Sequence, residues 1–226
     1  MEQGKIKESI LYEDNHLIIL NKKAGLLSQG DKTGDSSVID ILKNFIKIRD
    51  EKPGNVYLGL PHRLDRPVSG AIIACKTSKS LERMNALFRK QEIIKKYHAL
   101  CLNAPPDQQA QIVSYVKKDT SRNKVKCASR EFPGSKKAIL NYTYLSEFKN
   151  STHLIEVELK TGRPHQIRVQ LNSINCPILG DMKYYSQKAL SDKSIALHSR
   201  YLEFIHPVKK EKIQISAPYP DKNWWK

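Results

Sequence analysis

The chain contains the stretch His62-Arg63-Leu64-Asp65-Arg66-Pro67-Val68-Ser69-Gly70, followed directly by the apolar run 71–75. That run, bounded by turn residues, predicts a buried strand, so Asp65 is expected in a loop held by a rigid neighbour. Arg63 and Arg66 flank this acid, and nearby cations favour an ionised carboxylate. An ionised aspartate is suited to act as a nucleophile or an electrostatic stabiliser. The same string also fits a surface ion-pair turn, because structural ion pairs affect carboxylates in the same way.

Hydrophobic periodicity outside this stretch predicts both strands and helices. Strands are expected at 17–20, 71–75, 93–102, 138–145, 154–159, 196–204 and 212–216, with a hairpin formed by 112–116 and 125–128. Helices are expected from a Ser36 or Ser37 cap to residue 48, over 78–91, and over 165–171 with Pro164 in the first turn. Because strands and helices do not alternate regularly, we predict one α+β domain over 11–218, between an extension 1–10 and a tail 219–226.

Composition indicates a polyanionic partner. The 226 residues carry 39 Lys and Arg against 23 Asp and Glu, a formal net charge of +16. Nucleic acid is the leading candidate for such a surplus, although a generally lysine-rich proteome would produce it too. Cys75, Cys101, Cys127 and Cys176 lack paired spacing, so we expect them to be buried apolar residues in a reducing compartment.

The sequence also bears on location and assembly. Residues 1–8 carry acids and no apolar run follows them, which argues against a secretory or transit peptide. No stretch has the unbroken apolar length of a membrane span. We therefore expect a cytoplasmic protein that does not contact membranes, and a monomer, because no apolar surface stripe is predicted.

Several chemistries lack their sequence patterns. His62, His98, His165 and His198 have no metal-ligand spacing, paired cysteines or carboxylate cluster beside them, so no metal is expected. There is no G-x-S-x-G nucleophile turn and no phosphate-loop or dinucleotide glycine pattern. Cofactor-free chemistry is the expectation that remains.

Further motifs follow the Asp65 stretch in a fixed order. They are Lys96-Tyr97-His98-Ala99, Thr161-Gly162-Arg163-Pro164-His165-Gln166-Ile167-Arg168-Val169-Gln170, Leu197-His198-Ser199-Arg200 and His206-Pro207. With the Asp65 stretch, this series resembles the RluA class of RNA pseudouridine synthases from about residue 11 to 218. The resemblance implies an α+β catalytic fold with a mixed, largely antiparallel central sheet, flanking helices and an active-site cleft across the sheet.

The resemblance also implies an isomerase that breaks the N-glycosidic bond of a uridine, rotates the base and joins carbon 5 to the sugar. Asp65 matches the catalytic aspartate, which attacks either the sugar or the base. Tyr97 matches the tyrosine that stacks on the target base and helps to remove the carbon-5 proton. Arg168 matches the basic residue that pairs with the aspartate. The expected substrate is a uridine in structured ribosomal or transfer RNA, flipped out of its stack at a cost of a few kcal/mol.

The same motifs suggest which residues bind RNA. Arg63 matches the residue that fills the space left by the flipped nucleotide, and the other expected RNA-binding residues are His62, Arg66, Arg163, His165 and Gln166. Two positions depart from the family pattern: Lys23 stands where proline is usual, and Pro67-Val68 where a threonine commonly precedes the serine. No small RNA-binding module precedes the motifs, so we expect substrate choice to rest on the catalytic domain.

Two other readings stay open. One is an RNA-binding or RNA-chaperone protein on the same fold, with incidental isomerase activity. The other is a metal-dependent nuclease, which would cleave strands in a reaction that a chelator stops.

Overall fold

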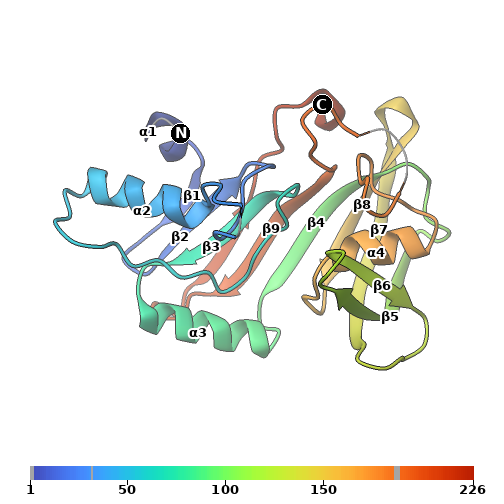
Figure 1. The fold of residues 1–226 in the computed structure, drawn as a ribbon, viewed down its shortest axis with the longest axis horizontal. Helices are drawn as coiled ribbons and strands as arrows, with labels where there is room; N and C mark the ends of the chain where they lie inside the picture. Colours follow the sequence, from blue (N-terminus) through green and yellow to red (C-terminus); the bar gives the residue numbers. More distant parts are fainter. Residues whose placement is uncertain (1–2, 32, 186–188) are drawn as a thin grey trace. The chain divides into compact units, whose positions relative to one another are not determined.

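The computed structural model describes residues 3–31, 33–185 and 189–226, and the chain divides into two compact units (Figure 1). Unit 1 consists of Met1–Ile94 and Ser199–Pro220, and unit 2 consists of Lys95–His198 and Asp221–Lys226. Residues 1 and 2 of the predicted N-terminal extension lie outside the described residues. Gln3–Lys7 of that extension form a short helix, α1. The predicted domain limits, 11 and 218, stay a prediction.

Unit 1 combines antiparallel strands with two longer helices. Its elements are β1 (Ile10–Glu13), β2 (Leu17–Lys22), α2 (Val38–Arg49), β3 (Ser69–Cys75), α3 (Ser78–Arg89), the part of β9 (Leu197–Ile205) from Ser199 onward, and β10 (Lys212–Ser216). The strand order is β1-β2-β3-β9, with β10 paired to β9. The pairs β1–β2, β2–β3 and β9–β10 are antiparallel.

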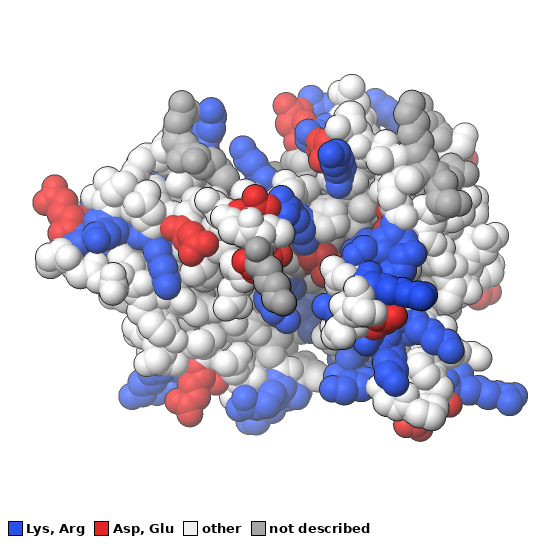
Figure 2. Space-filling view, in the orientation of Figure 1, with Lys and Arg blue, Asp and Glu red and all other residues white. Residues whose placement is uncertain are grey.

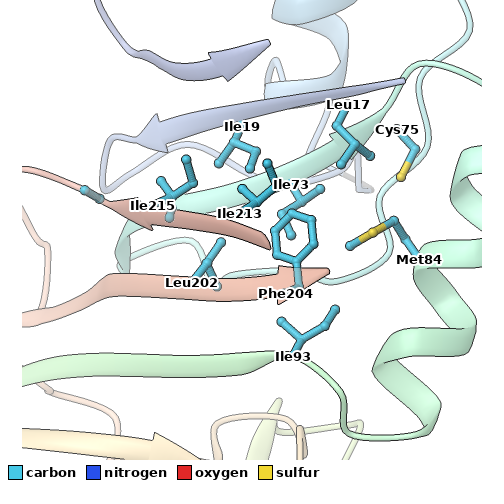
Figure 3. Close-up of a cluster of buried hydrophobic side chains, with 12 residues drawn as sticks. Leu17, Ile19, Ile73, Cys75, Met84, Ile93, Leu202, Phe204, Ile213 and Ile215 are labelled. Atoms are coloured by element: carbon cyan, nitrogen blue, oxygen red, sulfur yellow. The ribbon is translucent and has the colours of Figure 1, made fainter. Parts of the chain in front are cut away.

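The core of unit 1 explains why its two central strands read as apolar runs. All seven residues of β3 are buried, as are five of the six in β2. Leu17, Ile19 and Ile73 from these strands pack with Met84 of α3 and Phe204 of β9 in one cluster (Figure 3). β3, which directly follows the Asp65 stretch, is therefore fixed by burial along its whole length, as the sequence predicted.

Both long helices of unit 1 begin at side-chain caps. Ser37 caps α2 in a reciprocal capping box with Asp40, and Thr77 caps α3 in the same way with Ser80. Such caps satisfy backbone N–H groups that have no partner inside the helix. Of the two predicted caps for α2, Ser36 and Ser37, the structure selects Ser37, and the predicted Ser78 start of α3 is confirmed.

Unit 2 consists of antiparallel strands and, among its described residues, one α-helix. Its elements are β4 (Ile94–Cys101), β5 (Gln109–Asp119), β6 (Lys124–Ala128), β7 (Lys136–Phe148), a 3₁₀ turn (Lys149–Ser151), β8 (Thr152–Leu159), α4 (Gln166–Ser173) and a 3₁₀ turn (Asn223–Trp225). The strand order is β4-β8-β7-β5-β6, and all four pairings are antiparallel. The predicted hairpin is confirmed, and its strands extend further than expected. The predicted α+β class with a largely antiparallel sheet is confirmed too.

One boundary was predicted wrongly. Pro164 was expected in the first turn of a helix starting at His165, but α4 begins at Gln166. His165 has φ 50° and ψ 21°, the left-handed conformation, so it stands outside the helix and Pro164 precedes it. Ile167 and Leu171 are buried, as are the other residues of α4 from Gln166 to Leu171.

The cysteines are thiols, and three of them match the prediction. Cys75, Cys101 and Cys176 are buried, whereas Cys127 on β6 is half-buried. Burial raises the pKa of the Cys75 thiol to about 12. Cys75 is therefore protonated and apolar at neutral pH, which is the structural role expected from the sequence.

Candidate active-site residues and family membership

The backbone around Asp65 is fixed by hydrogen bonds on both sides. Ser28, which is buried, accepts the Leu64 N–H through Oγ at 3.1 Å and donates to the Leu64 carbonyl at 2.7 Å. The Val68 N–H donates to the Asp65 carbonyl at 3.0 Å and closes the turn that leads into β3. A carboxylate whose backbone is fixed in this way is held ready for chemistry, because little ordering remains to be done when a substrate binds.

Arg66 joins this loop to the segment after β2. Its backbone carbonyl accepts the Gly25 N–H at 2.8 Å, and its Nε donates to the Gly25 carbonyl at 3.0 Å. Its guanidinium forms an ion pair with Asp35 at 2.8 Å. Sequence reasoning treated Arg66 as a cation for Asp65, and the structure adds Asp35 as an ionic partner that the motif did not reveal. The side chain of Arg63 is exposed.

Lys22 is a functional candidate that sequence reasoning missed. It ends β2 with only 2% of its surface exposed. Its ammonium group donates to the carbonyls of Leu26 (2.9 Å), Lys23 (3.1 Å) and Arg66 (3.3 Å). Burial lowers the pKa of Lys22 to about 7, although the negative charge of Asp65 opposes that shift. The side chain therefore links β2 directly to the Asp65 loop.

The sequence carried one signal for Lys22. The run Leu17-Ile18-Ile19-Leu20 continues as strand through Asn21 and Lys22, so the lysine remains within the sheet. The strand was expected to end at Leu20, and a lysine at the end of a buried strand commonly extends its charged group to solvent. Two of the carbonyls that hold it inside, those of Lys23 and Leu26, are local, and the third, that of Arg66, comes from a segment 44 residues away.

His62 is bound inside unit 1. Its Nε2 accepts the Ile73 N–H of β3 at 2.9 Å, and its ring stacks on Phe88 of α3 with a centroid distance of 5.0 Å. An accepting Nε2 is unprotonated, which assigns the neutral form of the ring with its proton on Nδ1. These contacts give His62 a structural role in positioning the loop, and its predicted RNA contact stays a prediction.

Tyr97 lies on β4 in unit 2, opposite Val157 of β8. It is buried, with 6% of its surface exposed, as are Ala99 and Cys101 on the same side of the strand. Lys96 and His98 lie on the other side, where both contact Glu156. The strand expected at 93–102 is therefore present, and its side chains alternate between the two faces of the sheet.

The segment before α4 is stabilised by Gln166. Its Oε1 accepts from the Thr161 hydroxyl at 2.8 Å and the Arg163 N–H at 2.9 Å, and its Nε2 donates to the Ile139 carbonyl at 3.0 Å. Gln166 is 3% exposed. Arg163 is half-buried, and its Nε donates to the Lys137 carbonyl at 3.0 Å. Gln166 thus shapes the segment from within the protein, and the RNA contacts predicted for Gln166 and Arg163 stay predictions.

Arg168 has an ionic partner that the sequence did not identify. Its guanidinium donates to Asp181 through two hydrogen bonds of 2.7 Å, from Nε and Nη2, with side-chain exposures of 5% and 2%. The same guanidinium lies over the ring of Tyr184, 5.1 Å from the centroid. Bidentate pairing in a buried site holds an arginine in one orientation. The sequence offered one indication of this partner, because the acid Asp181 closely follows the apolar run 177–179. The pairing of Arg168 with Asp65 stays a prediction.

His165 connects this cluster to the hairpin. Its Nδ1 is 2.6 Å from the Tyr184 hydroxyl, which also accepts the Val125 N–H of β6 at 2.9 Å. Because the hydroxyl accepts from Val125, its own proton is available for His165. The left-handed backbone of His165 is rarely adopted by residues other than glycine and costs of order 1–3 kcal/mol. Within unit 2, the structure thus brings together His165, Arg168, Asp181 and Tyr184.

Two searches of the described residues gave negative results. Over 3–31, 33–185 and 189–226, no group of three His, Cys, Asp or Glu side chains could hold a metal ion. Within the same ranges, no helix has the length and apolarity needed to cross a membrane.

Comparison with known proteins begins with a family model. Residues 16–173 match the model described as RNA pseudouridylate synthase. The matched region includes the Asp65 stretch, Tyr97 and Arg168.

Similar curated proteins carry related names. A protein of Buchnera aphidicola (subspecies Baizongia pistaciae) named "Ribosomal large subunit pseudouridine synthase C" is 35% identical over 216 residues, which are 92% of this chain and 66% of that protein. The "Uncharacterized RNA pseudouridine synthase YhcT" of Bacillus subtilis is 32% identical over 97% of this chain and 70% of that protein. The chain thus spans about two thirds of the length of these relatives.

A solved structure shows the same fold. "Human RNA Pseudouridylate Synthase Domain Containing 4" superposes with a TM-score of 0.78 at 24% identity, covering 97% of this chain and 91% of that one. The fold expected from the motifs is therefore confirmed. The family match over most of the chain and the curated relatives confirm the resemblance as well, and the chain belongs to the RNA pseudouridylate synthase family.

Proposed function

We propose that this protein isomerises specific uridines to pseudouridine in structured RNA, without a cofactor and with Asp65 as the essential catalytic residue. The observation that carries the proposal is the Asp65 loop, in which a motif acid lies on a backbone fixed by Ser28 and by the ammonium group of Lys22, which donates to the Arg66 carbonyl. Large-subunit ribosomal RNA is the first candidate substrate because the Buchnera relative is named for it. Transfer RNA is the second.

The proposed roles follow from the chemistry of each side chain. Asp65 attacks the sugar or the base while the glycosidic bond is broken. Tyr97 stacks on the flipped base and helps to remove the proton from carbon 5. Arg168 pairs with Asp65 and favours its ionised form. Arg63, which is exposed, occupies the space that the flipped nucleotide leaves.

The charge on unit 2 supports an RNA partner. We call the hairpin β5–β6 the basic hairpin; its exposed cations are Lys117, Lys118, Arg122, Lys124 and Lys126. Figure 2 shows basic side chains gathered over the region where Figure 1 draws β5, β6 and α4. Lys117 and Lys126 lie directly opposite each other, an arrangement that destabilises a strand pair unless an anion offsets it.

This surface fits the phosphate backbone. Phosphate contacts by lysine and arginine release counterions, so binding should weaken steeply as salt is raised. The proposed RNA-binding set also includes His62, Arg66, Arg163, His165 and Gln166. A ribosomal or transfer RNA substrate would place the protein in the cytoplasm, where we propose that it acts as a monomer.

The test uses large-subunit ribosomal RNA transcribed with uridine tritiated at carbon 5. Joining that carbon to the sugar displaces its hydrogen, so tritium release reports the reaction. The wild-type protein is expected to release tritium, and Asp65→Asn is expected to release none while binding the same RNA. Asp50→Asn, which removes an exposed acid of the same unit, serves as the matched control. Full activity of Asp65→Asn would overturn the assignment of Asp65.

The same variants separate the alternatives. An RNA chaperone with incidental isomerase activity predicts that Asp65→Asn restores growth of a deletion strain as well as wild type does. A nuclease predicts strand cleavage that a chelator stops. Mapping pseudouridines in total RNA from cells with and without the gene would identify the target, and unchanged maps would count against the proposed activity.

A further inference from the structure

Tyr184 touches three parts of unit 2 with one side chain. Its ring lies 5.1 Å from the guanidinium carbon of Arg168, and its hydroxyl contacts both Val125 on the basic hairpin and His165 before α4. No motif or charge pattern in the sequence singled out this tyrosine. Its contacts make it the link between a surface suited to RNA and an arginine proposed for catalysis.

The ring and the hydroxyl of Tyr184 contact different groups. The ring faces a guanidinium that Asp181 already holds through two hydrogen bonds, so the arginine is fixed from its edge and from its face. The hydroxyl accepts the N–H of Val125, which directly follows the exposed cation Lys124. A displacement of β6 at this point is passed to the ring and hence to Arg168.

The surrounding packing makes such a transfer efficient. Val116 of β5, Val125 of β6 and Val169 of α4 belong to one buried cluster, and Tyr184 packs against it. The neighbouring Lys183 adds a second tie, because its ammonium group donates to the Asn123 carbonyl in the hairpin turn at 2.9 Å. Figure 1 shows α4 beside this hairpin. Close-packed interiors of this kind transmit small shifts rather than absorb them.

We propose that Tyr184 is a positioning residue that couples RNA binding by the basic hairpin to the orientation of Arg168. RNA phosphates held by Lys124 fix β6, and Tyr184 then fixes the guanidinium for the reaction. Coupling requires that a contact on the hairpin influence the chemical step as well as binding. The inference rests on the proposed function, because it assigns Arg168 a part in the isomerisation.

A double-mutant cycle tests this coupling. Lys124→Ala, Tyr184→Phe and the double variant are compared with wild type by tritium release at saturating and limiting RNA. Tyr184→Phe keeps the ring under Arg168 but removes the hydroxyl bonds to Val125 and His165. We expect Lys124→Ala to raise KM and to lower kcat at least about fivefold in the wild-type background, the lower end of typical coupling between sites. In the Tyr184→Phe background it should raise KM equally but leave kcat unchanged.

The control is Tyr144→Phe, which removes another tyrosine hydroxyl paired with a histidine, 3.3 Å from His153 Nδ1. In that background Lys124→Ala should lower kcat as it does in wild type. All variants are assayed at one temperature below the melting temperature of Tyr184→Phe, so that loss of the fold does not enter the comparison. If Lys124→Ala lowers kcat equally in all backgrounds, the coupling is refuted. The proposed function would still stand in that case, because the wild-type protein is active. An inactive wild type would refute both.

Discussion

Replacing Lys22 by methionine should change how the stability of the protein depends on pH. Lys22 is buried, and burial lowers the pKa of its ammonium group to about 7 from the ordinary 10.5. Between these two values the unfolded chain binds a proton that the folded chain does not. The free energy of unfolding therefore rises with pH in this window, and the contribution is absent below about pH 7, where both states are protonated. Methionine has similar length and does not titrate.

The size of the effect follows from the shift. Each pKa unit corresponds to about 1.4 kcal/mol, so between about pH 6 and pH 9 wild type should gain about 3 kcal/mol over Lys22→Met. In the variant, the carbonyls of Lys23 and Leu26 lose the donor that Lys22 provides. This loss costs about 1–3 kcal/mol for each group and applies at every pH. The variant should therefore be less stable than wild type at both pH values, and its deficit should be about 3 kcal/mol larger near pH 9 than near pH 6.

Urea unfolding of both proteins at the two pH values measures the difference. A direct check is the titration of the Lys22 carbon next to the amine by NMR, which should have its midpoint near pH 7. Parallel stability profiles, or a midpoint near 10, would refute the reasoning. In that case, hydrogen bonds to the three carbonyls would stabilise the charged form of Lys22 more than burial destabilises it.

Other predictions concern Arg168, Gly70 and Lys124. Asp181→Asn should cost about 3–5 kcal/mol of unfolding free energy, because it removes the negative charge that pairs with the buried guanidinium of Arg168 through two hydrogen bonds. Gly70→Ala should cost about 3 kcal/mol or more, since Gly70 has φ 112° and a Cβ would lie 2.4 Å from the Ser199 carbonyl oxygen. Lys124→Ala should reduce the slope of log binding constant against log salt by about one, the loss of one phosphate contact.

Each of these predictions has a matched control. Glu92→Gln removes the acid from the exposed ion pair between Lys90 and Glu92, and it should leave the free energy of unfolding unchanged within error. Gly54→Ala adds a Cβ where no atom lies within 4 Å, and should be tolerated. Lys79→Ala removes a cation from α3 and should keep the salt slope. Urea unfolding reads the first two and RNA titrations read the third. Equal effects of variant and control would contradict the corresponding prediction.

The sequence alone determined the local elements and the identity of the motif. An unbroken apolar run located β3, because a strand buried on both faces is apolar along its whole length. A 3.6-residue period located α2 and α3, because these helices bury one face. The capping signal at Ser37 needed no tertiary information either, since the cap bonds residues three apart. Asp65 and Arg168 were likewise named from residues that lie in contiguous motifs.

Only the tertiary structure decided which partners these side chains have. The ammonium group of Lys22 donates to three backbone carbonyls, one of them that of Arg66 in the Asp65 loop. Arg168 is paired with Asp181, and Tyr184 connects α4 to β6. The α4 boundary also needed the structure, because His165 takes a left-handed conformation that a helix pattern does not reveal. A hydrogen bond between residues far apart in the sequence produces no repeating pattern of residue types. Contacts of this kind appear only once packing has brought distant segments together.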